Sequence, residues 1–220
     1  MKSKKGQKRI FWEAFVLALF VFGIGVALGF FIEGWRGGEI DMMYLNSEVE
    51  LLDLKLQGQI LDLNLVDCDK AIAENIRFAD RVYEEAKTLK SYEDAQRLSE
   101  SLILQHKKYD LLRALVWMNS IKIKEKCNAN YHNIVYIYQY DNPGIEKRSE
   151  QSIFSKLLEE LKNRQGDKAL LLPIAGDLSS ISIDTLRYKY NITELPTILI
   201  DEKIKITELN NVEEIEKLLK

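Results

Sequence analysis

The chain has 220 residues, of which 46% are hydrophobic and 30% are charged, and its formal net charge is −3 at pH 7. This composition excludes a collagen-like or wholly disordered chain, and the presence of only two cysteines excludes a disulfide-dense scaffold. The apolar residues are concentrated between Ala14 and Ile32, where no charged residue occurs. The sequence contains no second stretch of this kind, so a multi-spanning helical membrane protein is excluded as well.

The uncharged run 14–32 predicts a single transmembrane helix, because about 20 apolar residues are needed to cross a hydrocarbon core of roughly 30 Å. Cations gather before the run and only one follows it closely: Lys2, Lys4, Lys5, Lys8 and Arg9, then Arg36. This bias predicts a cytoplasmic tail at 1–13 and an extracytoplasmic remainder at the cell membrane. The alternative is a cleaved signal peptide, but the long run and the lack of a clean small-x-small site favour an uncleaved signal-anchor.

The part of the chain that follows Ile32 is acidic, with 26 basic against 33 acidic residues. A nucleic-acid-binding protein needs a basic face that displaces counterions from the phosphates. We therefore expect no nucleic-acid partner, and we interpret the basic N-terminal tail as a topology signal.

Between residues 39 and 127 the apolar residues recur every three or four positions, which is typical of one face of a helix. The first series, interrupted by Gly58, is Leu45, Val49, Leu52, Leu56, Ile60, Leu63 and Val66. We expect a break near 67–69 and a further helix that begins at a capping box in 91–94. The apolar face of that helix would comprise Leu98, Leu102, Tyr109, Leu112, Val116 and Ile123.

Helices with such stripes must bury them, so 39–127 predicts a helical hairpin or coiled coil that acts as a structural support or spacer. The heptads are irregular and define no oligomeric state. The helices are nevertheless the candidate surface for a homo-oligomer.

From residue 128 onward, short apolar runs alternate with amphipathic stretches. We predict strands at 133–139, 169–174, 197–200 and 203–206, and helices at 146–164, 183–190 and 212–219. The order β-α-β-α-β-β-α predicts an α/β domain at 131–220 with a central mixed sheet. Its first two strands would be parallel and its last two would form a hairpin.

This element order, together with the segment YNITELPTILI at 190–200, resembles the thioredoxin-like superfamily. Members of this family carry a cis-proline that precedes a strand and faces the active site. The resemblance implies that Pro196 is that residue and that its peptide bond is cis. The alternative is a trans-proline that opens an edge strand.

In thioredoxin-like proteins the catalytic cysteines lie just after the first strand, where a helix N-terminus lowers the thiol pKa. The corresponding segment here, YDNPGIEKRSE at 140–150, contains no cysteine. If the pair at 150–151 follows the second cysteine at the distance usual in the family, the resemblance implies that Ile145 and Arg148 occupy the two thiol positions. The whole layout also resembles archaeal-type anchored proteins with a helical hairpin and a thioredoxin-like domain, many of which carry C-x-x-C. The chain is similar to a redox-inactive member of that group.

The resemblance implies a groove for extended polypeptide beside the cis-proline. The candidate binding residues are Asp141, Asn142, Pro143, Gly144, Ile145, Arg148, Leu195 and Pro196. We assign no catalytic residue, no cofactor and no metal site. Dithiol–disulfide exchange by the usual mechanism is not expected.

Cys68 lies between helical stretches, and Cys127 ends the last helix before the first strand. Outside the cytoplasm a disulfide between them is permitted and is the favoured interpretation, against two unpaired core thiols and a redox or metal role. Two cysteines without nearby histidines make no zinc site. The two histidines, His106 and His132, are expected at the surface, and 191–193 forms a glycosylation sequon.

Together these features favour a membrane-anchored, extracytoplasmic, redox-inactive thioredoxin-like module for binding or assembly. The enzymatic alternative is a thiol–disulfide oxidoreductase or chaperone partner that uses Cys68 and Cys127. A third alternative is a structural component of a cell-envelope complex.

Overall fold

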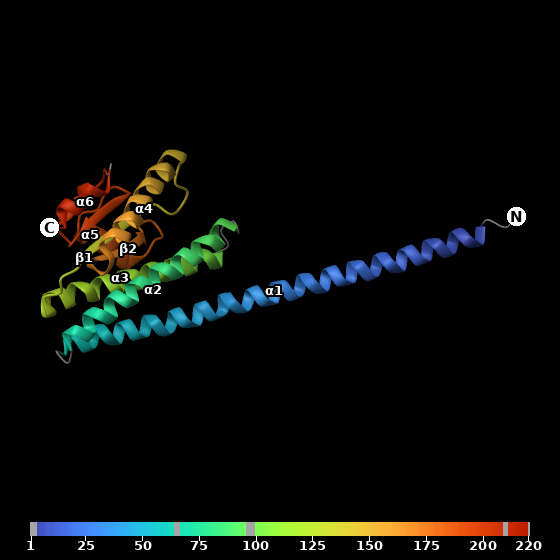
Figure 1. Cartoon of the computed structure of the whole chain (residues 1–220), viewed down its shortest axis with the longest axis horizontal. Helices are drawn as coiled ribbons and strands as arrows, with labels where there is room; N and C mark the ends of the chain where they lie inside the picture. Colours follow the sequence, from blue (N-terminus) through green and yellow to red (C-terminus); the bar gives the residue numbers. More distant parts are fainter. Residues whose placement is uncertain (1–3, 64–66, 96–99, 209–210, 220) are drawn as a thin grey trace. The chain divides into compact units, whose positions relative to one another are not determined.

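A computed structural model describes residues 4–63, 67–95, 100–208 and 211–219. The helices are α1 (Lys4–Asp62), α2 (Cys68–Ala95), α3 (Glu100–Cys127), α4 (Ile145–Gln165), the short 3₁₀ helix η1 (Gly166–Lys168), α5 (Ile181–Lys189) and α6 (Val212–Leu218). The strands are β1 (His132–Tyr138), β2 (Ala169–Ala175), β3 (Thr197–Ile200) and β4 (Ile204–Ile206) (Figure 1). The chain divides into two compact units, Met1–Glu48 and Val49–Lys220. The domain boundaries expected from the sequence stay a prediction.

The first unit contains one helical stretch that is long and apolar enough to cross a membrane. It spans Phe11–Ile32, has a mean hydropathy of 2.7, and its side chains are all exposed. The stretch contains the uncharged run 14–32 and extends it by one turn toward the N-terminus. An N-terminal candidate membrane helix is therefore present in α1.

The helices α2 and α3 lie side by side and form an antiparallel pair (Figure 1). The described part of the apolar face predicted for α3 is buried, at Tyr109, Leu112, Val116 and Ile123. Trp117, one residue along, is fully buried as well. Leu98 and the side chain of Leu102, which completed the prediction, lie outside the described residues.

The start predicted for this helix is wrong. Residues 91–94 belong to the last turn of α2, and α3 begins at Glu100. A Ser-x-x-Asp sequence is compatible with a helix interior as well as with a cap. Because neither glycine nor proline occurs in α2, its sequence contains no strong signal to end the helix earlier.

The face predicted to be buried on the first helix is also wrong. Leu45, Val49, Leu52, Leu56, Ile60 and Leu63 are exposed, and Val66 lies outside the described residues. Leu54 and Leu61 are buried instead, on the side where Gly58 approaches α3. A Cβ atom at Gly58 would lie 2.7 Å from the side-chain oxygen of Asn119, whose amide donates to Leu54 O at 3.0 Å. Gly58 therefore permits close helix packing rather than loosening the helix.

The mixed sheet has the strand order β2-β1-β3-β4. β1 is parallel to β2, with His132 opposite Ala169, and antiparallel to β3, which forms the predicted hairpin with β4. One face of the sheet packs against α4 and α6 through Phe154, Leu158, Leu161, Val212 and Ile215. The other face packs against α2, α3 and α5. The predicted α/β class and the predicted order of strands and helices are confirmed.

Candidate functional site

The carboxyl ends of β1 and β2 form one edge of the sheet, which we call the carboxyl edge. The Leu195–Pro196 peptide bond is cis, as the family resemblance implies. Because Ile137 pairs with Thr197, Pro196 lies beside the last residues of β1. A Cβ atom at Gly176, just after β2, would lie 2.8 Å from Ile137 and 3.1 Å from Leu195. Only glycine therefore fits between β1 and the cis-proline loop without a shift of its neighbours.

The loop 139–144 that follows β1 is fixed by two side chains from elsewhere. The Gln151 amide accepts a hydrogen bond from Gln139 N at 2.7 Å and donates to Gln139 O at 3.0 Å. The Asp177 carboxylate accepts from Tyr140 N at 2.8 Å and from Asp141 N at 2.9 Å. Side chains thus accept hydrogen bonds from three consecutive backbone N–H groups. A loop needs such partners because its backbone has none from a sheet or a helix. This loop has a defined backbone.

His106 from α3 lies at the same edge and is buried, with 8% of its surface exposed. Its Nε2 atom is 2.8 Å from the Tyr138 hydroxyl, and its ring lies 4.0 Å from that of Tyr140, between centroids. The expectation of a surface histidine was wrong. Nothing in the local sequence around His106 identifies its partners, because Tyr138 and Tyr140 come from a strand and loop 32 and more residues away.

A buried ion pair between Asp110 and Arg113 lies next to His106 on the same helix. Asp110 is fully buried and accepts a hydrogen bond from Arg113 Nη1 at 2.9 Å, while His106 Nε2 lies 3.6 Å from its other oxygen. Burial raises the pKa of Asp110 to about 6, against the opposing effects of His106 and Arg113. The spacing i, i+4, i+7 places the three groups on one side of α3, at the margin of its apolar face. That spacing is the sequence signal that could have pointed to this cluster.

The predicted groove residues lie at or next to the carboxyl edge. Asp141, Asn142, Gly144, Ile145 and Arg148 are exposed, Pro143 and Leu195 are half-buried, and Pro196 is buried. The structure brings Leu195 and the end of β2 together, and it links Asp141 to Asp177. The binding role of these residues stays a prediction. Sequence reasoning missed Gln151 and Asp177, which hold the loop.

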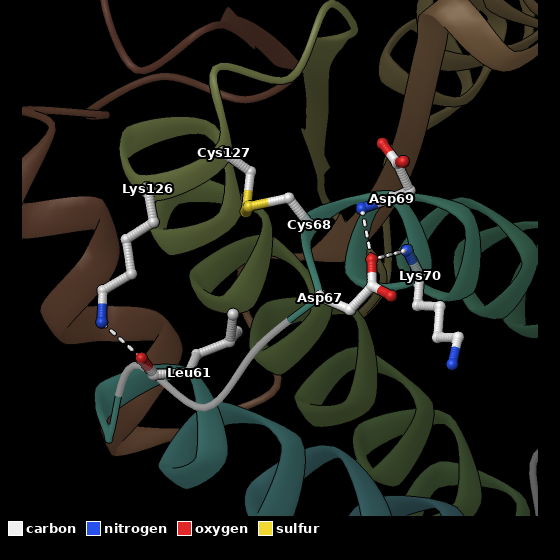
Figure 2. Close-up of a disulfide and its surroundings, with 7 residues drawn as sticks. All are labelled: Leu61, Asp67, Cys68, Asp69, Lys70, Lys126 and Cys127. Carbon is white, nitrogen blue, oxygen red and sulfur yellow. Dashed lines mark hydrogen bonds between the residues drawn. A yellow bond between two sulfur atoms is a disulfide. The ribbon is translucent and has the colours of Figure 1, made fainter.

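Cys68 and Cys127 form a disulfide with a Cα–Cα distance of 5.3 Å, and it joins the start of α2 to the end of α3 (Figure 2). The favoured interpretation of the two cysteines is confirmed, and the alternative of two unpaired thiols is wrong. Asp67 caps α2, since its carboxylate accepts from the N–H groups of Asp69 and Lys70. Nearby, Lys126 Nζ donates to Leu61 O, which ties the end of α3 to α1.

The opposite edge of the sheet, at the start of β1, we call the amino edge. There the β3–β4 turn places Asp201 and Glu202 at φ 47° and 61°. Asp201 accepts from Lys124 Nζ and, at 2.9 Å, from Asn133 N, and its other oxygen lies 2.6 Å from His132 Nδ1. Burial acts to raise the pKa of Asp201, but these hydrogen bonds outweigh it and hold that pKa below the ordinary value.

Two further side chains complete the amino edge. Glu202 accepts a hydrogen bond from Trp117 Nε1 at 2.6 Å and from Asn133 Nδ2 at 3.0 Å. His132, which was expected at the surface, is half-buried against Asp201. Among the residues that the structure describes, no group of three or more His, Cys, Asp or Glu side chains is arranged to hold a metal ion.

Comparison with known proteins finds a weak likeness to solved structures. No family model matches the chain, and no curated protein matches it. A crystal structure of thioredoxin O2 from Arabidopsis thaliana in its oxidized state is similar over 47% of this chain and 84% of its own, with 17% identity and a TM-score of 0.32. A likeness at this level carries no argument about chemistry.

Proposed function

We propose that this chain is a membrane-anchored, extracytoplasmic, thioredoxin-like module that binds an extended segment of a partner protein and does not exchange disulfides. The candidate span Phe11–Ile32 would hold it in the cell membrane, with the preceding cations on the cytoplasmic side. The partner would lie along the carboxyl edge, beside Pro196 and the loop 139–144.

The observation that carries this proposal is the position of the disulfide relative to that loop. Both cysteines are paired near the amino edge, whereas the loop lies at the far end of β1, about 20 Å along a seven-residue strand. The loop contains no cysteine, and Gln151 and Asp177 fix its backbone. A loop that contains no thiol and whose backbone is held by side chains supports binding rather than redox chemistry.

Two isoleucines supply the apolar contacts that such a site needs. Ile145 is the first residue of α4 and is 91% exposed, and Ile181 is the first residue of α5 and is 86% exposed. Each helix follows one of the two parallel strands, so both isoleucines flank the carboxyl edge from opposite faces of the sheet. Neither side chain contributes to the core. Exposed apolar side chains on both sides of one edge support a protein partner.

A photocrosslinking amino acid at Ile145 tests the groove in cells that express the full chain. We expect adducts with a partner protein, identified by mass spectrometry, that an Ile181→Asp substitution reduces at least tenfold. The matched control is a crosslinker at Ile153, which lies two turns further along α4 and is also exposed. Equal adducts from both positions would refute a site at the carboxyl edge.

A second measurement separates this proposal from the oxidoreductase alternative. The purified chain should not catalyse insulin reduction, and its disulfide should survive a glutathione mixture of mildly reducing poise. Thiol-dependent turnover that Cys68→Ser abolishes would overturn the proposal in favour of the enzyme.

A further inference from the structure

An apolar stripe remains exposed on the part of α1 that belongs to the second unit. It consists of Val49, Leu52, Leu56, Ile60 and the adjoining Leu63, whose exposed fractions lie between 45% and 67%. Leu63 continues the helical turn, since its N–H donates to Gln59 O at 3.1 Å. We call this set the α1 stripe. Five large apolar side chains on one helix face exceed the scattered exposure normal for a surface.

The packing of the opposite face prevents the stripe from turning inward. Leu54 and Leu61 are buried, and Gly58 lies against Asn119 of α3 with no room for a side chain. Glu50 is paired with Arg81 of α2 at 3.0 Å. These contacts fix the rotation of α1 about its axis. The stripe faces away from α2 and α3 and needs a different partner.

The spacing of the stripe identifies the kind of partner. Its members are separated by three, four, four and three residues, which places them on one face of α1 and departs from a strict heptad at Ile60. A stripe of this kind is complementary to a second helix that carries the same spacing. We propose that the α1 stripes of two copies of this chain pair in parallel.

Membrane anchoring, on which this inference rests through the proposed function, favours a second copy over another helix. Copies that are anchored through the same span would present the same stripe on the same side of the membrane and with the same chain direction. Five partly exposed side chains on one helix offer less area than the roughly 800 Å² per partner of a stable interface in solution. An area this small suits copies that the membrane already concentrates and aligns.

The test uses the purified full chain in phosphatidylcholine vesicles, with a photocrosslinking amino acid at Leu56. We expect an adduct of twice the chain mass, which Leu52→Lys together with Ile60→Lys reduces at least tenfold. Both positions are exposed, so the fold should persist, and an unchanged thermal unfolding curve checks this. The matched control is Leu104→Lys on α3, where a leucine of similar exposure lies outside the stripe and the adduct should be unaffected.

The same samples distinguish failure of this inference from failure of the anchor. A chain that floats with the vesicles but gives monomers or lipid adducts alone overturns the pairing and leaves the anchor intact. A chain that does not float refutes the anchor and the pairing together. A dimer that survives the double lysine variant also overturns the α1 stripe as the contact surface, and Ile145→Asp should leave the dimer unchanged.

Discussion

The two edges of the sheet differ in how they are stabilised, although each is bounded by the same four strands. Near the amino edge, the Cys68–Cys127 disulfide joins α2 to α3. Asp201 and Glu202 accept hydrogen bonds there from β1 and α3. At the carboxyl edge the loop is held by noncovalent bonds from Gln151 and Asp177, and isoleucines are left in solvent. The amino edge is suited to resist unfolding, and the carboxyl edge presents a surface for a partner.

This difference indicates that stability and recognition are separated along β1. The disulfide and the contacts of Asp201 and Glu202 lie where a partner is not expected. Changes at the amino edge should therefore alter global stability and spare binding, whereas changes to the loop contacts at the carboxyl edge should alter binding and have little effect on global stability.

Replacing both Cys68 and Cys127 with serine should cause the largest decrease in the free energy of unfolding. A loop of 59 residues contributes about 4 kcal/mol in the chain-entropy account of disulfides, and that stabilisation would be lost. Denaturant unfolding of the full chain in detergent measures it. Dithiothreitol should destabilise the unmodified chain by a similar amount and leave the double variant unchanged. Loss of the crosslinks at Ile145 while the variant is still folded would contradict the separation of the two edges.

Asp201→Ala should lower the free energy of unfolding by about 2–3 kcal/mol, because Lys124 and Asn133 N lose their charged acceptor. Alanine also tolerates the positive φ of the turn poorly, whereas asparagine tolerates it better. Asp201→Asn should therefore cost less than alanine. The matched control is Asp167→Ala at an exposed position in η1.

The pH dependence of this contribution has a fixed sign. Since the folded-state pKa of Asp201 is lowered, its stabilisation is present above pH 3.8 and is lost as the pH falls below that value. The part of the Asp201→Ala cost that comes from the charge should thus be lost in acid, whereas the part that comes from the positive φ should remain. A cost that is constant down to pH 2 would show that the charge is not the cause.

Asp110, near the carboxyl edge, should show the opposite dependence. Its pKa is raised from 3.8 to about 6, so the folded state is favoured below pH 3.8 and this advantage is lost as the pH rises through 6. The free energy of unfolding should be measured from pH 4 to 7 for the unmodified chain and for Asp110→Asn. Over this range that of the unmodified chain should fall, relative to that of the variant, by on the order of 2 kcal/mol. Parallel curves for the two proteins would contradict the assignment to Asp110.

The smallest global effect is expected for Asp177→Ala, below about 1 kcal/mol, because only two hydrogen bonds at a partly exposed loop are lost. Amide hydrogen exchange at Tyr140 and Asp141 should nevertheless accelerate at least tenfold. Gln151→Ala is the matched change on the other side of the loop and should expose Gln139 instead. Unchanged exchange at all three residues would show that these side chains do not hold the loop.

Much of the fold was predictable because its signals are local. The four strands are short apolar runs, and each observed strand matches the predicted one to within one residue at either end. The cis bond before Pro196 followed from the resemblance carried by 190–200. The binding role of the candidate groove residues stays a prediction. Asp177 and Gln151 were missed because a side-chain bond to a loop backbone leaves no periodic pattern in the sequence.

The sequence by itself determined the apolar N-terminal helix, the order of strands and helices, and the absence of cysteine from the loop after β1. Only the tertiary structure decided which face of α1 is buried, because periodicity identifies an apolar face without saying what covers it. It also decided that His106 is buried and that Gly58 permits close packing. Those outcomes depend on side chains that are distant in sequence and meet only when α1, α3 and β1 pack together.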